Sequence, residues 1–199
     1  MSEAGNSNSV MPFQFDRAKA VQAAAFLLKT RPSRTDNYMR LLKILYVADR
    51  ESLQETGTPI TGDKFVSMKH GTMLTKLLDL AKKKESRAYP DPQNHEYWDE
   101  YIARDGSFDI RLLSDPGVGA LCEYEIRKLQ EVAERFKDYN QFDMGKYTHE
   151  LPEYNDPGAG SEPISFNRLL EVLGLSDAAD AIVDEAVESA AIKALLGGA

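Results

Sequence analysis

The stretch that decides the fold is 38–71, which reads YMRLLKILYVADRESLQETGTPITGDKFVSMKHG. Its first half predicts a helix that is capped by Thr35 or Asp36, runs to Thr56 and stops at Gly57. Apolar side chains cover so much of this helix that we expect it to be central and packed on several sides. They are Met39, Leu41, Leu42, Ile44, Leu45, Tyr46 and Val47.

The second half of the stretch predicts a turn followed by a short strand. Residues 58–62 include Pro59 and Gly62, which favour turns, and 64–69 alternates in polarity, with Phe65 and Val66 favouring a strand. Gly71 is expected to break the chain before a helix that starts near Met73. Residues 86–95 are polar, contain two prolines and predict a loop.

Residues 100–112 predict a β-hairpin, because Asp105-Gly106 is the preferred dipeptide of a two-residue type I′ turn. The expected cross-strand pairs are Ala103 with Phe108, Tyr101 with Ile110, and Glu100 with Arg111. The expected buried face is Tyr101, Ala103, Phe108, Ile110 and Leu112. The pair of Glu100 and Arg111 would add an attractive charge contact on the other face.

Helical periodicity and capping residues predict five further helices. They lie at 16–30, 118–139, 143–151, 166–173 and 176–196. Glu125 interrupts an apolar stripe, which either helical crowding or a polar contact could accommodate. The sequence therefore predicts a mostly α, α+β fold with a central buried helix and a small antiparallel sheet. We expect a disordered tail at 1–12 and a single domain at 13–196, in which 163–196 is a C-terminal helical extension packed on the rest.

Composition excludes several classes of protein. The formal charge of −8 argues against a general nucleic-acid binder, since phosphate contacts need clustered Lys and Arg. No apolar run approaches the roughly 20 residues needed to cross a bilayer, so we expect no membrane partner. The N-terminus lacks the features of a signal peptide, and Cys122 is the only cysteine, which fits the cytoplasm. Cys122 falls inside a predicted helix and is expected to be a structural thiol.

The search for catalytic and metal-binding motifs finds little. His149-Glu150-Leu151-Pro152 begins like a zinc-protease motif but lacks the second histidine four residues on. The other histidines, His70 and His95, have no Cys/His ligand spacing, and phosphate-binding glycine motifs are absent. We therefore expect no catalytic residue, no metal and no cofactor.

Asp49 follows the apolar stripe by one helical turn and has two interpretations. It could sit at the buried rim and accept a hydrogen bond from a backbone amide of the 60–63 turn. It could instead take part in partner recognition. The basic cluster also has two interpretations, and it consists of Lys82, Lys83, Lys84 and Arg87. It could be the solvated C-terminal end of a helix, or a patch that binds nucleic acid or an acidic partner.

Three blocks of this sequence resemble the core signature of the SocA-like, Panacea-domain antitoxins. They are LLKILYVADR at 41–50, GTPITGD at 57–63 and FVSMKHG at 65–71. A late block, YTHELPE at 147–153, resembles that family's Thr-His motif, although Tyr154 stands where an aromatic that is often Trp tends to follow. The similarity extends over nearly the whole chain.

The resemblance implies an antitoxin that binds and neutralises a cognate protein toxin encoded by an adjacent gene. In one branch of the family the antitoxin acts as a proteolytic adaptor that hands the toxin to the ClpXP protease, and the small apolar C-terminus at 194–199 could serve as a flexible handle. The candidate scaffold or partner-contact residues lie in the matching blocks. They are Tyr46, Asp49, Arg50, Asp63, Lys69, His70, His149 and Glu150.

Two functions of other classes are kept as alternatives. A small enzyme would need His149, Glu150, Asp49 or Asp63 to converge in a cleft. A DNA-binding regulator would have to use the basic cluster near Lys82, against the negative charge of the whole chain.

Overall fold

The computed structural model describes residues 11–83 and 92–196. It is 56% helical and, in the described residues, contains eight α-helices and small three-stranded antiparallel sheets, so the predicted mostly α (α+β) class is confirmed. Most of the predicted N-terminal tail, Lys84 and Arg87 of the basic cluster, and the end of the predicted C-terminal handle lie outside the described residues.

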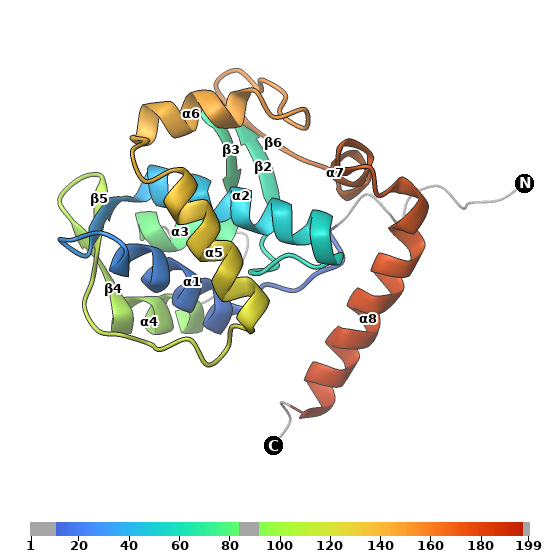
Figure 1. The fold of residues 1–199 in the computed structure, drawn as a ribbon, viewed down its shortest axis with the longest axis horizontal. Coiled ribbons are helices and arrows are strands. Elements are labelled where there is room, and N and C mark those ends of the chain that lie inside the picture. Colours follow the sequence, from blue (N-terminus) through green and yellow to red (C-terminus); the bar gives the residue numbers. More distant parts are fainter. Residues whose placement is uncertain (1–10, 84–91, 197–199) are drawn as a thin grey trace, which may run out of the picture.

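Helix α2 (Tyr38–Thr56) occupies the middle of the fold (Figure 1). Leu42, Leu45 and Tyr46 are fully buried, as expected for a helix packed on several sides. The helix ends at Gly57 with a left-handed φ of 76°, as predicted. The predicted N-cap is wrong, because Asn37 accepts hydrogen bonds from the amides of Met39 and Arg40. Thr35 and Asp36 belong instead to strand β1 (Thr35–Asn37).

Four helices pack around α2, namely α1 (Arg17–Lys29), α3 (Thr75–Lys82), α5 (Glu123–Arg135) and α6 (Gln141–His149). Asp16 caps α1 as predicted, by accepting from the amide of Lys19 at 3.0 Å. Helix α5 begins five residues later than predicted, since the preceding segment contains Pro116, Gly117 and Gly119, which disfavour a helix.

The start of α5 also corrects the expectation for Cys122. This residue lies at the N-cap, outside the helix, and it is exposed. Of the two alternatives for Glu125, the structure shows the polar contact. Glu125 accepts from the backbone amide of Cys122 at 2.8 Å and from Lys19 Nζ at 2.6 Å.

One sheet has the order β3-β2-β6, formed by β2 (Phe65–Met68), β3 (Gly71–Leu74) and β6 (Ser161–Pro163). Strand β2 is confirmed, but Met73 and Leu74, expected to begin a helix after a break at Gly71, belong to a strand that pairs with β2. The helix starts only at Thr75, because the carboxylate of Asp63 accepts from the amides of Lys76 and Leu77 and so caps it there. Strand β6 was not predicted.

The other sheet has the order β1-β5-β4, with β4 (Ile102–Asp105) and β5 (Asp109–Leu112) forming the predicted hairpin in a different register. Ala103 lies opposite Arg111, and Phe108 is 63% exposed in the loop. Helix α4 (Pro92–Tyr101) replaces part of the predicted loop and contains Glu100 and Tyr101, so neither residue can make its predicted cross-strand pair. Ile110 is buried as predicted, and the observed register also buries Ile102, which was not on the predicted face.

The C-terminal segment follows β6 as α7 (Phe166–Leu173), a short 3₁₀ turn at Ser176–Ala178 and α8 (Ala179–Leu196). Ser165 caps α7 and Gly174 ends it, as predicted. Figure 1 shows α8 along one side of the molecule, away from the helices that surround α2. Among the residues that the structure describes, no helix combines the length and the apolar character needed to span a bilayer.

Candidate functional site

The carboxylate of Asp49 is bonded inside the protein. Its Oδ1 accepts from the amide of Thr61 at 3.0 Å, and its Oδ2 accepts from the Thr61 hydroxyl. This is the hydrogen bond to the 60–63 turn that one interpretation of the sequence predicted. Burial raises the pKa of Asp49 to about 7, and the nearby carboxyl of Asp63 adds to that rise. Asp49 therefore ties α2 to the turn.

Asp63 is also buried, and both of its carboxylate oxygens accept hydrogen bonds within the protein. Its carboxylate accepts from the amides of Lys64, Lys76 and Leu77 and from the hydroxyl of Thr75. Burial raises its pKa as well. These bonds join the turn before β2 to the start of α3, so the side chain acts as a helix cap supplied from a distant segment.

Tyr46 and Arg50 converge on Glu153, a residue that sequence reasoning placed in the late motif without naming it as a site residue. Glu153 Oε1 accepts from the Tyr46 hydroxyl at 3.0 Å and from Arg50 Nε at 2.7 Å. The Glu153 side chain is completely buried. Two successive turns of α2 thereby hold the chain just after α6.

Lys43 is a buried cation that sequence reasoning did not single out. Its Nζ donates to the carbonyl oxygen of Thr72 and to Thr148 Oγ1, both at 3.0 Å. Within the described residues no carboxylate is bonded to it, and burial lowers its pKa to about 7. The periodicity of α2 places Lys43 one turn before Tyr46 and Val47, which is the one signal that could have identified it.

Gly71 lets β3 approach this buried lysine closely. Its φ is 97°, and a β-carbon there would lie 2.1 Å from Thr148 Oγ1 and 2.8 Å from Lys43 Nζ. The glycine therefore meets both a backbone and a packing requirement. Together Lys43, Thr72 and Thr148 fasten the β2–β3 hairpin and α6 to α2.

Four of the candidate residues lie at the surface above these buried contacts. Lys69 and His70 form the exposed β2–β3 turn, and His149 and Glu150 end α6. The two segments are neighbours, because a β-carbon at Gly71 would lie 3.1 Å from His149 Cδ2. His149 stacks on Tyr154, with ring centroids 4.4 Å apart. We call Lys69, His70, His149, Glu150 and Tyr154 the hairpin–helix surface.

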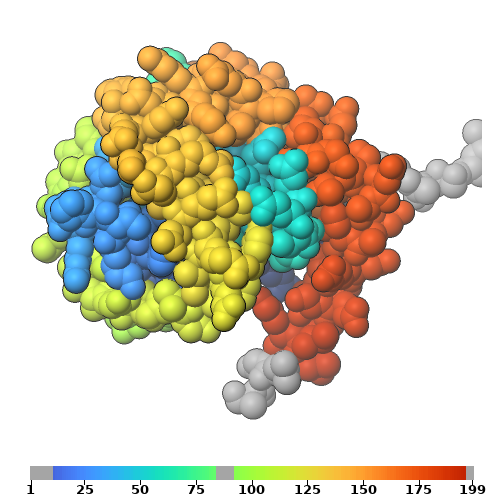
Figure 2. Space-filling model, in the orientation of Figure 1, coloured from blue at the N-terminus to red at the C-terminus, as the bar shows by residue number. Residues whose placement is uncertain are grey.

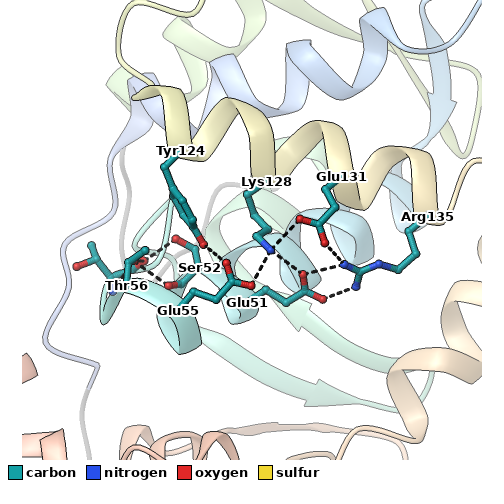
Figure 3. Close-up of polar contacts among 9 residues, drawn as sticks. Glu51, Ser52, Glu55, Thr56, Tyr124, Lys128, Glu131 and Arg135 are labelled. Atoms are coloured by element: carbon teal, nitrogen blue, oxygen red, sulfur yellow. Dashed lines mark hydrogen bonds and ion pairs between the residues drawn. The ribbon is translucent and has the colours of Figure 1, made fainter.

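A separate charged cluster joins α2 to α5 (Figure 3). Lys128 is nearly buried, and its Nζ bonds to carboxylates of Glu51, Glu55 and Glu131. Arg135 bonds to Glu51 and Glu131. These contacts raise the pKa of Lys128 against the opposing effect of burial. The charges of this cluster are paired with one another inside the protein, and the ion pairs connect α2 with α5.

The structure divides the candidate residues by depth. Asp49 and Asp63 lie together in the interior, whereas His149 and Glu150 lie at the surface, so the four do not form one open cleft. The part of the chain that the structure describes has no group of three or more His, Cys, Asp or Glu side chains placed to hold a metal ion. Of the basic cluster, Lys83 pairs with Asp99 at 3.2 Å.

Comparison with known families identifies the domain. The family model described as antitoxin SocA-like, Panacea domain, matches residues 41–154, which is more than half of the chain. The matched region runs from α2 to the stacked Tyr154 and contains every candidate residue. No curated protein and no solved structure matches the chain. The chain belongs to the SocA-like antitoxin, Panacea domain family.

Proposed function

We propose that this member of the SocA-like family is an antitoxin that neutralises a cognate protein toxin by binding it directly. The family match over residues 41–154 carries the proposal. The division of the candidate residues supports it: the buried ones build the scaffold, and the exposed ones are available to a partner. The protein would act by covering or distorting the active surface of the toxin, without catalysing a reaction.

The hairpin–helix surface is the proposed contact within the family domain. It presents both charges and two stacked rings, and aromatic side chains on a rigid base are common anchors of protein interfaces. Its base is attached to α2 by the hydrogen bonds of Lys43 and Glu153, and Gly71 allows β3 to approach α2 closely.

Co-expression with the protein encoded by the adjacent gene tests this function. The adjacent gene product alone should arrest growth, and the chain should restore growth and co-purify with it at a fixed stoichiometry. The variant Lys69→Glu/His149→Glu should weaken both effects, whereas Arg127→Glu on the exposed side of α5 should not. Failure of the wild-type chain to restore growth or to co-purify would rule the function out.

A proteolytic adaptor that delivers the toxin to ClpXP is the second candidate mechanism, favoured by the exposed, small and apolar residues near the end of α8. The half-life of the toxin separates the two mechanisms. Direct neutralisation leaves the half-life unchanged with and without this chain, whereas an adaptor shortens it only in cells that contain the protease.

A further inference from the structure

Helix α8 lies outside the region matched by the family, and its buried side chains are confined to its first half. Ile182 and Ala186 are its buried residues. Ile182 sits beside Gly57 at the end of α2, where a β-carbon on the glycine would lie 3.5 Å from Ile182 Cγ1. Beyond Ala186, no described residue of α8 is buried. Figure 2 shows α8 on one side of the molecule.

From Val187 onward, α8 carries apolar side chains that face away from the protein. Val187, Ala191 and Leu195 are spaced four residues apart and therefore share one side of the helix. That side is opposite Ile182 and Ala186, given the 3.6-residue turn of a helix. Val187 is 59% exposed, Leu195 is 83% exposed, and the adjacent Ile192 is 49% exposed. A helix that is apolar on two opposite sides is typical of one packed between two layers.

The same outward side is acidic from Asp180 to Glu188. Asp180, Asp184 and Glu188 repeat every four residues and fall on the side that carries Val187 and Leu195. The one basic residue of α8 is Lys193, which lies on the inward side and pairs with Asp16 at 3.0 Å. The outward side therefore carries three acidic side chains and no basic residue of α8. Exposed apolar side chains follow on the same side toward the end of the helix.

We propose that the outward side of α8 is a docking surface for a basic partner protein, which offers an apolar groove bordered by Lys or Arg side chains. The proposal rests on the proposed function, so the partner is the cognate toxin. The apolar residues would anchor the helix in the groove, and the three carboxylates would steer the encounter. A second α8 would not complement these carboxylates, because its one basic residue, Lys193, lies on the inward side and pairs with Asp16.

The position of α8 gives this contact a distinct role. The hairpin–helix surface lies inside the region that the family model matches, whereas α8 lies outside it. Binding through α8 would therefore select one toxin by contacts that the shared domain does not supply.

The test uses the full chain and the purified product of the adjacent gene. Val187→Glu/Leu195→Glu should weaken binding by about tenfold or more with an unchanged melting temperature, because both side chains are exposed. The matched control is Phe108→Glu/Phe142→Glu, which alters two side chains of similar exposure elsewhere. This control should change the affinity by less than about twofold.

The triple variant Asp180→Asn/Asp184→Asn/Glu188→Gln should slow association and reduce its dependence on salt, while changing the dissociation rate little. Wild-type affinity in both α8 variants would overturn the docking role and leave the proposed function intact. No binding by the wild-type chain would overturn both. A dimer of the chain alone that Val187→Glu/Leu195→Glu disrupts would also overturn the proposal, since a second copy would then occupy the surface.

Discussion

Helices α2 and α8 are nearly equal in length, but the fold uses them in opposite ways. Helix α2 buries most of its side chains, including Lys43 and Asp49, and each buried polar group on it finds a partner in another segment. Helix α8 buries two residues and leaves an acidic and apolar side in solvent. The difference indicates that α2 builds the core of the domain, and it agrees with the proposal that α8 contacts a partner.

The sharpest test of the role of α2 is Gly71→Ala, since it disturbs the junction between α2, β3 and α6. The left-handed φ disfavours alanine by about 1–2 kcal/mol, and the new β-carbon would clash with Thr148 Oγ1. We expect a loss of about 3 kcal/mol or more in the free energy of unfolding, measured by urea denaturation.

Gly106→Ala is the control for this change. Gly106 also has a positive φ, 70°, but nothing lies within 4 Å of its β-carbon position. Gly106→Ala should lose about 1 kcal/mol of unfolding free energy, because only the unfavourable backbone conformation contributes there. Equal losses at the two glycines would mean that the close packing around Gly71 contributes little.

The second test concerns Lys43, whose pKa is lowered from 10.5 to about 7 by burial. Between pH 7 and 10.5 the unfolded chain binds more protons at this residue than the folded chain, so its contribution makes stability rise with pH. Lys43→Met should reduce the gain in unfolding free energy between pH 7 and pH 9 by about 2 kcal/mol. Urea denaturation at both pH values measures it.

Lys69→Met is the matched control, because Lys69 is exposed in the β2–β3 turn. It should leave the pH profile unchanged. A Lys43→Met profile that parallels the wild type from pH 7 to pH 9 would contradict the assignment of that gain to the buried lysine.

The third test concerns the attachment of α8. Ile182→Ala truncates the larger of the two buried side chains of this helix, and we expect a loss of about 2 kcal/mol. Amide hydrogen exchange should become faster in residues 179–196 and stay unchanged in 38–56. Faster exchange in both helices would show that α8 supports the core, against the comparison drawn above.

The smallest expected effect is that of Val187→Ser on stability. Val187 is 59% exposed, so the free energy of unfolding should change by less than about 0.5 kcal/mol. Thermal unfolding measures this change. A clear destabilisation would mean that the outward side of α8 is packed within this chain and is unavailable to a partner.

The sequence by itself determined the local features whose cause lies within a few residues. The apolar periodicity of 38–56 identified a central helix, and Asp16, Gly57, Ser165 and Gly174 marked helix ends correctly. The signature in 41–71 identified the family, and the position of Asp49 indicated its bond to the following turn. Helix stripes and caps are local physics, so the order of the residues suffices to find them.

The tertiary structure decided the features that depend on distant partners. Residues 71–74 form a strand because β2 lies beside them. The observed hairpin register differs from the predicted one and buries Ile102 together with Ile110. Lys43 became a buried link only because Thr72 and Thr148, 29 and 105 residues away, supply its acceptors. The two-sided character of α8 likewise appears only when the side facing α2 is known, because burial is a property of the packed chain and spacing alone does not assign it.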